Sequence, residues 1–152
     1  MEQDIVVSIT KNNKFEEPQV SDIRTCWLKV KPGIEKILSE NAHLTYMPED
    51  VYSECVNGRA VLYTSPLGFV VLTIETDAFT RDKTLVVWVA YVYETGAHNW
   101  LTHIEWFEGV AKAFDCKFIE AQSAVPEFEE YFTSTGWQLE TRIYIREVID
   151  GS

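Results

Sequence analysis

The histidines and cysteines are the residues whose spacing could indicate a metal site or disulfide bonds. His98 and His103 are five residues apart in a segment with a helical pattern, whereas two zinc ligands on one helix face are four apart. The cysteines Cys26, Cys55 and Cys116 are far apart in the sequence, and their odd number argues against a disulfide framework. The sequence therefore predicts no metal site, and the three thiols are expected to be buried among apolar residues.

A ligand site is predicted where a long apolar segment meets a helix. Residues 84–93 are almost all β-branched or aromatic, which is typical of a strand covered on both faces. After the turn 94–97, hydrophobic residues recur at helical spacing as far as Phe114. A second apolar segment, 116–121, completes a strand–helix–strand unit, whose strands normally run parallel. The helix then begins beside the C-terminal end of a central strand, where α/β sheets tend to bind ligands.

The other expected elements surround this unit. Ser21 is a candidate cap for the first helix, in which Pro32-Gly33 predicts a kink or a break into two short helices. Asn57-Gly58 predicts the left-handed end of the second helix. We expect helices at 22–40, 48–56 and 126–132 and further strands at 4–10, 59–64, 69–76 and 141–148, with 59–64 and 69–76 as an antiparallel hairpin. This order indicates a mixed sheet in an α+β or α/β domain.

Length and composition predict one domain over residues 1–152. A hydrophobic fraction of 46% is ample for a core. The formal net charge of -11 argues against direct DNA binding, which needs clustered Lys and Arg, and it suits a cationic partner or simple solubility. The sequence has neither an apolar run of membrane-spanning length nor a signal-peptide core, so a cytoplasmic protein without membrane attachment is expected.

Several segments resemble the GNAT (GCN5-related N-acetyltransferase) family. Glu130-Tyr-Phe-Thr-Ser-Thr-Gly136-Trp137 is similar to the family's short helix and following Gly-Phe pair, and Ala111-Lys-Ala-Phe-Asp-Cys116 to the end of its third helix. Segments 27–38 and 47–52 look more specifically like small GNAT-like proteins of tailed bacteriophages, some of them acetyltransferases and some virion-assembly proteins. The resemblance covers nearly the whole chain. It implies a GNAT-like α+β (α/β-like) fold: a mixed, mainly antiparallel sheet with a central βαβ crossover and helices on both faces.

The resemblance also implies a site for acyl-CoA, here acetyl-CoA, at the splayed end of the central strand. In the family the pyrophosphate sits on backbone amides of a glycine-rich loop at the N-terminus of the next helix. In this chain the loop departs from that pattern, because Glu94 is acidic, no basic or amide residue precedes the glycine, and Trp100 is bulky. The residues that fall at the cofactor position are Tyr91, Val92, Tyr93, Gly96, Ala97, His98 and Asn99.

A catalytic acid and a base are implied in the same way. The family's acid is usually a tyrosine four residues before the glycine of the Gly-Phe pair, and that position here is Phe132. The neighbouring Tyr131 is therefore the candidate acid. The base is often a glutamate, and Glu94 and Glu75 lie at or near strand ends, as does Glu120.

Two hypotheses about function follow. The first is an acyl-CoA-dependent N-acyltransferase acting on a cationic amine or a protein lysine. The second is a GNAT-fold phage protein without catalysis, which binds a protein partner or its own copies during head assembly or within the virion, in the host cytoplasm or the particle. Trp106, which lies off the helix's inward stripe, is a candidate residue for facing a partner. A Trp100 indole that fills the tip of the helix would favour the second hypothesis.

Overall fold

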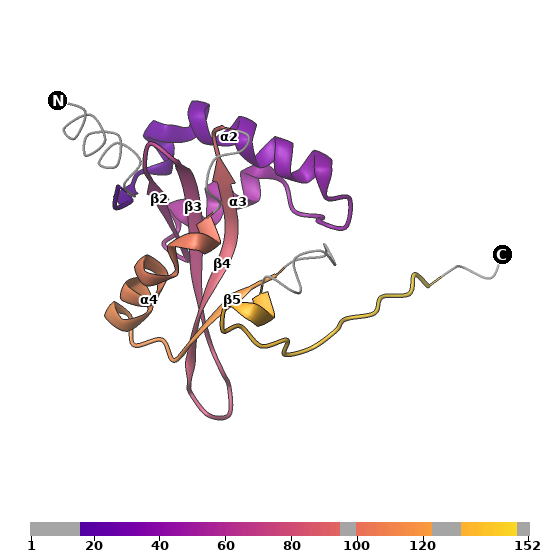
Figure 1. The fold of residues 1–152 in the computed structure, drawn as a ribbon. Coiled ribbons are helices and arrows are strands. Elements are labelled where there is room, and N and C mark those ends of the chain that lie inside the picture. Colours follow the sequence, from indigo (N-terminus) through magenta and orange to yellow (C-terminus); the bar gives the residue numbers. More distant parts are fainter. Residues whose placement is uncertain (1–15, 95–99, 123–131, 149–152) are drawn as a thin grey trace, which may run out of the picture. The chain divides into compact units, whose positions relative to one another are not determined.

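A computed structural model describes residues 16–94, 100–122 and 132–148 (Figure 1). Its contacts divide the chain into two compact units, Met1–Ala121 and Gln122–Ser152. In the described part of the second unit, residues 132–134 form a short helical turn and residues 137–148 have no regular secondary structure. The first unit contains β1 (Gln19–Ser21), α2 (Ile23–Glu40), α3 (Pro48–Val56), β2 (Ala60–Thr64), β3 (Gly68–Thr76), β4 (Lys83–Val92), the 3-10 helix η1 (Trp100–His103), α4 (Ile104–Ala113) and β5 (Phe118–Ala121).

The sheet of the first unit has its strands in sequence order, β1-β2-β3-β4-β5. The first three pairings are antiparallel, and β4 pairs with β5 in parallel. The helical segment η1–α4 lies between these two parallel strands in the chain, so the predicted strand–helix–strand unit is confirmed. The predicted hairpin is confirmed as β2 and β3, and the expected mixed, mainly antiparallel sheet is present.

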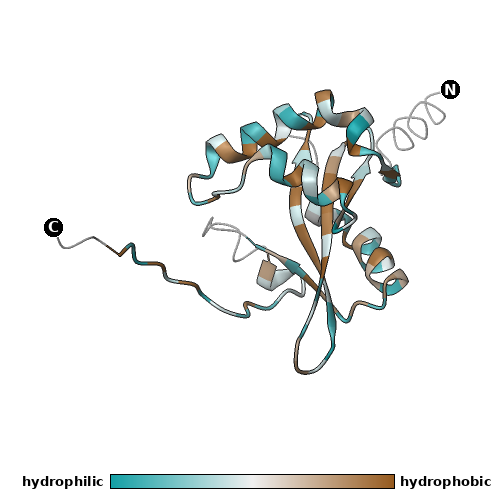
Figure 2. Cartoon of the chain, turned by 180° about the vertical axis from the view of Figure 1, so that it is seen from behind, coloured by the Kyte–Doolittle hydropathy of each residue, from teal (hydrophilic) through white to brown (hydrophobic). Residues whose placement is uncertain are grey.

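Both faces of the central strands are covered by helices. Phe69 and Val71 of β3 pack in one cluster with residues of α2 and α3, whereas Val70 and Leu72 pack in another with Phe107 of α4. This alternation is the period-two pattern of a strand buried on both sides. Figure 2 shows the corresponding hydrophobic colouring of the central strands, beside helices that carry both hydrophobic and hydrophilic residues.

The helix α2 is continuous, so of the two outcomes predicted at Pro32-Gly33 the break into two short helices is wrong. Pro32 lies on the exposed side of the helix, where water can solvate the carbonyl group that loses its donor. Gly33 is buried, and a Cβ atom there would lie 2.7 Å from Cε2 of Phe69 and 2.8 Å from Cδ2 of Tyr91. The glycine therefore allows two aromatic rings to touch the helix backbone, and it does not interrupt the helix.

The start of α2 also corrects a prediction. Asp22 caps the helix, because its carboxylate accepts a hydrogen bond from the backbone N–H of Arg24 at 2.9 Å. Arg24 lowers the pKa of this carboxyl, first through a side-chain hydrogen bond and then through its backbone N–H. Ser21, the predicted cap, belongs instead to β1, a strand that the sequence did not predict, and its hydroxyl lies 2.6 Å from the hydroxyl of Thr64.

The ends of the chain differ most from expectation. The predicted strand 141–148 is wrong, since these residues are not in a strand. The predicted strand 4–10 lies outside the described residues, as does the predicted helix 126–132 except for Phe132. By contrast, the helix 48–56 is confirmed as α3, and Gly58 has the expected positive φ of 77°. The three cysteines are free and half-buried, so their predicted burial is only partial.

Candidate functional site

The predicted ligand site falls at the C-terminal end of β4. Pairing between β4 and β5 ends at Val87 and Ala121, although β4 continues to Val92. Val71 pairs with Val89 while Leu72 pairs with Val87, so Trp88 is an extra residue in β4. Such a bulge bends and twists a strand. In the described chain, residues 89–92 at the end of β4 are therefore paired with β3 alone, as the family resemblance implies for the splayed end of the central strand.

The side chain of Trp100 closes this end of β4 on the α4 side. Its indole N–H donates a hydrogen bond of 2.9 Å to the backbone carbonyl oxygen of Tyr91. Trp100 is only 2% exposed, and its ring lies 6.0 Å from that of Trp106 and 6.4 Å from that of Phe107. A buried indole needs a partner for its one donor, and here the partner is the strand itself. The first described residue of the helical segment is thus a core residue that is bonded to the end of the strand.

Gly68 makes room for the same carbonyl group. It pairs with Val92 across the hairpin, and a Cβ atom at position 68 would lie 1.9 Å from the carbonyl oxygen of Tyr91. No side chain can be accommodated at that distance, and the obstacle is backbone. Sequence reasoning missed this role, because Gly68 reads locally as the last residue of a turn. Only the long-range pairing with residues 91 and 92 explains the glycine.

Aromatic residues also line the α2 side of the end of β4. The ring of Tyr91 lies 5.5 Å from that of Phe69 and 6.1 Å from that of Tyr93. The ammonium group of Lys29, on α2, lies 4.7 Å from the centroid of the Tyr93 ring. Burial raises the pKa of the Tyr93 hydroxyl above its ordinary value, and the neighbouring Cys26 and Tyr91 act in the same direction.

The predicted cofactor residues are only partly visible. Tyr91, Val92 and Tyr93 are half-buried at the end of β4, and Glu94 is exposed just beyond it. The other predicted cofactor residues, Gly96, Ala97, His98 and Asn99, lie outside the described residues.

The two candidate bases are not brought together. Glu75 pairs with Thr84, near the start of β4, whereas Glu94 follows the end of that strand. At about 3.3 Å per residue, the eight steps from Thr84 to Val92 at the end of β4 span about 26 Å. Glu120, the third glutamate, is half-buried in β5 opposite Val86. Of the three, Glu94 alone lies at the splayed end of β4.

The predicted catalytic acid, Tyr131, lies outside the described residues, but the next residue is visible. The ring of Phe132 packs edge-on against that of Trp137 at 5.4 Å. Phe132 stands where the family resemblance implies a tyrosine, and a phenyl ring has no proton to donate.

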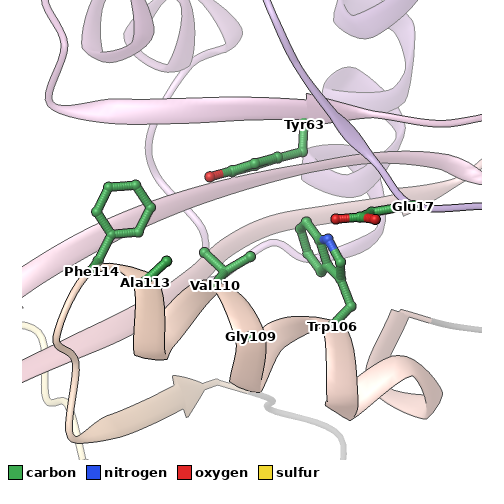
Figure 3. Close-up of a pocket in the computed structure, with 7 residues that line it drawn as sticks. All are labelled: Glu17, Tyr63, Trp106, Gly109, Val110, Ala113 and Phe114. Atoms are coloured by element: carbon green, nitrogen blue, oxygen red, sulfur yellow. The ribbon is translucent and has the colours of Figure 1, made fainter.

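A second concave site lies beside α4, and we call it the α4 groove. Its volume is about 570 Å³. Tyr63 of β2 and the helix residues face each other across it, with the carboxylate of Glu17 at one end near the indole of Trp106 (Figure 3). The ring of Trp106 packs against that of Tyr63 at 5.2 Å, so the predicted partner-facing tryptophan is half-buried. The residues that line the groove are Glu17, Tyr63, Trp106, Gly109, Val110, Ala113 and Phe114.

Within residues 16–94, 100–122 and 132–148, no three His, Cys, Asp or Glu side chains are arranged to hold a metal ion. Nor does any helix in that part of the chain combine the length and apolar character needed to cross a bilayer.

The fold is similar to that of solved structures, although the sequence has no recognisable relatives among family models or curated proteins. No protein-family model matches the sequence, and no curated protein matches it significantly. Among solved structures, a probable acetyltransferase superposes with a TM-score of 0.65 at 16% identity, over 89% of this chain and 100% of its own. A possible acetyltransferase from Clostridium difficile 630 superposes with a TM-score of 0.63 at 11% identity, over 88% of this chain and 98% of its own. An acetyltransferase from Trypanosoma brucei superposes with a TM-score of 0.58 at 11% identity, over 87% of this chain and 99% of its own. The fold is therefore that of the GNAT acetyltransferases.

Proposed function

We propose that this chain uses the acetyltransferase fold as a scaffold for binding another protein and does not transfer acyl groups. The observation that supports this proposal is the buried indole of Trp100, bonded to the carbonyl oxygen of Tyr91 at the splayed end of β4. The family resemblance implies that acyl-CoA binds at this end of the strand, against the tip of the following helix. In this chain the first described residue of that helical segment contributes its side chain to the core.

The energy needed to displace that side chain is a large fraction of the binding free energy of a ligand with a micromolar Kd, which is about 8 kcal/mol. Burying a tryptophan removes about 150–250 Å² from water, worth about 4–6 kcal/mol at about 25 cal/mol per Å². The hydrogen bond to the strand adds about 1 kcal/mol. A cofactor that had to expel Trp100 would lose at least about a thousandfold in affinity.

The charge at the site also disfavours binding of a cofactor that carries a pyrophosphate. Glu94 is exposed at the end of β4, and the chain has a formal net charge of -11. A pyrophosphate needs backbone amides or cations and is repelled by carboxylates. Lys29 is the cation seen against the aromatic residues of this end, and its ammonium already lies over the Tyr93 ring.

The partner that we propose is a protein of an assembling phage particle, or further copies of the chain. This rests on the resemblance of segments 27–38 and 47–52 to small GNAT-like phage proteins, some of which act in virion assembly. The proposal places the chain in the host cytoplasm or in the virion.

The second candidate function is an acyl-CoA-dependent N-acyltransferase. The end of the described β4–β5 pairing at Val87 favours it, because the family resemblance implies that the cofactor binds where these two strands part. In this case Glu94 is the candidate base and Tyr131 the candidate acid, and the acidic chain would attract a cationic amine or a protein lysine.

Thermal unfolding with acetyl-CoA separates the two candidates. At a hundred times its dissociation constant, a ligand adds about 2.7 kcal/mol to the stability of the folded state, which raises the Tm of a chain of this size by about 5–10 °C. We expect no shift at millimolar acetyl-CoA. A shift of several degrees, with acetyl transfer to a lysine peptide that falls in Glu94→Gln, would overturn the binding proposal and establish the enzyme. Co-sedimentation of the full chain with a large assembly, or self-association in light scattering, is the result that the binding proposal expects.

A further inference from the structure

The α4 groove lies where the described chain begins. Glu17, only the second described residue, forms one end of the groove (Figure 3). Fifteen residues precede the described part, so the chain before Glu16 leaves from the edge of an apolar concavity. We propose that the chain's own N-terminal segment, Ile5–Ile9, lies in the α4 groove.

The segment is within reach of the groove. Seven residues, 10–16, separate Ile9 from Glu17. Fully extended, they span at most about 25 Å, and they include the polar sequence Lys11-Asn-Asn-Lys14, which suits a turn. From its first residue to its fifth, an extended strand spans about 13 Å. The groove follows α4 from Trp106 to Phe114, about 12 Å at 1.5 Å per residue. A short extended segment that turns back therefore matches its length.

The chemistry of the segment also fits. In an extended conformation Ile5, Val7 and Ile9 lie on one face, and that face is wholly apolar. Ser8 lies on the opposite face and is suited to solvent. Apart from the carboxylate of Glu17, the groove offers aromatic and aliphatic side chains and the backbone of Gly109. An apolar strand face removes such a surface from water, which is the main favourable term in docking.

The apolar surface continues from the groove onto β1. Val20 pairs directly with Tyr63, so the two side chains share a face of the sheet, and Val20 is 68% exposed. Phe114, at the other end, is 42% exposed. β1 pairs only with β2 among the described strands and so has an open edge. The segment that continues from β1 toward the N-terminus is the part of this chain placed to cover this surface.

Hydrogen–deuterium exchange on the full chain tests the proposal. We expect amides in residues 5–9 to be protected at least about tenfold relative to an unstructured peptide, and equally at low and high protein concentration. Val7→Asp should abolish this protection, because it places a charge on the face that enters the groove. Ser8→Asp is the matched control on the opposite face and should retain it.

A second pair of variants tests the groove itself. Ala113→Gln places a longer side chain on the wall of the groove, whereas Lys112→Gln introduces the same residue at an exposed neighbour outside the lining. Only Ala113→Gln should lower the protection of residues 5–9. Far-ultraviolet circular dichroism verifies that each variant is folded, and Val7→Asp gives the answer even if Ala113→Gln does not fold.

Three results would overturn the proposal. The first is an unprotected segment in the unmodified chain. The second is protection that survives both Val7→Asp and Ala113→Gln. The third is protection that grows with concentration together with a doubled mass in light scattering, because a second copy would then fill the groove.

Discussion

On the α2 face of the sheet an 18-residue helix lies so close that its backbone touches the rings of Phe69 and Tyr91 at Gly33. On the opposite face α4 has 10 residues, and it leaves the α4 groove open beside Tyr63. The strand β3 supplies buried side chains to both faces equally. The difference therefore comes from the covering helices: one face is sealed by a glycine contact, and the other is closed by single large side chains, of which Trp100 is the most deeply buried indole.

The largest expected effects come from deleting one central phenyl ring on each face. Phe69 and Phe107 are both fully buried. Phe→Ala in a core costs about 3–5 kcal/mol, and the cost depends on how well the surroundings collapse. We expect Phe69→Ala to lie near the upper limit, because α2 is fixed against the sheet. Phe107→Ala should lie near the lower limit, because α4 borders a groove and can shift. Urea unfolding measures both, and an equal or larger loss for Phe107→Ala would contradict the comparison.

Next in size is a pair of Gly→Ala substitutions in the two helices, which should change stability in opposite directions. At Gly33 the added Cβ meets two rings at 2.7 and 2.8 Å, so overpacking should cost about 1–3 kcal/mol. At Gly109 no atom lies within 4 Å of the added Cβ, and the better helix propensity of alanine should add up to about 1 kcal/mol. Thermal unfolding of the two variants provides the measurement. A stabilised Gly33→Ala would show that the α2 face is not sealed at this contact.

A smaller effect is expected for Trp100→Phe. This change keeps an aromatic ring at the end of β4 but removes the N–H that donates to the carbonyl oxygen of Tyr91. The lost hydrogen bond should cost about 1 kcal/mol, the net value of a typical hydrogen bond, in addition to the packing lost with the smaller ring. Trp106→Phe is a suitable control, since that ring packs against Tyr63 in the same cluster. If both variants unfold at the same urea concentration as the unmodified chain, the indole bond does not stabilise the strand end.

Residues 84–93, Gly33 and Gly68 show what the sequence could and could not predict. The apolar residues 84–93 and the following helical pattern predicted the parallel pair of strands correctly, because both signals are local. Pro32-Gly33 was read locally as a break, but its meaning depends on rings about 40 and 60 residues away in the chain. In the same way, Gly68 is explained only by its approach to the Tyr91 carbonyl.

The candidate bases and residues 141–148 likewise depend on contacts between distant parts of the chain, which local patterns do not reveal. Glu75 and Glu94 both lie near strand ends in the sequence, but β3 and β4 are antiparallel, so the end of β3 lies beside the start of β4. The two carboxylates are therefore separated by the length of the hairpin. Residues 141–148 alternate as a strand does, and a strand also needs a neighbour to pair with, which periodicity does not reveal.

The smallest expected effect is a difference in thiol reactivity between a cysteine on the α2 face and one on the α4 face. Burial, helped by the charge of Glu54, raises the pKa of Cys55 on the α2 face from 9.0 to about 11. Burial also raises the pKa of Cys116 on the α4 face, but Lys83 opposes that shift.

Alkylation rates at pH 8 measure this difference, because the thiolate is the reacting form. A pKa of about 11 leaves Cys55 about a hundredfold less thiolate than a thiol of pKa 9.0, so it should be alkylated more slowly than Cys116. Since the folded pKa exceeds the unfolded one, the contribution of Cys55 to stability is present below pH 9 and is lost as the pH rises toward 11. Mass spectrometry of iodoacetamide-treated protein gives both rates, and equal labelling would show that α3 and α2 open as readily as α4.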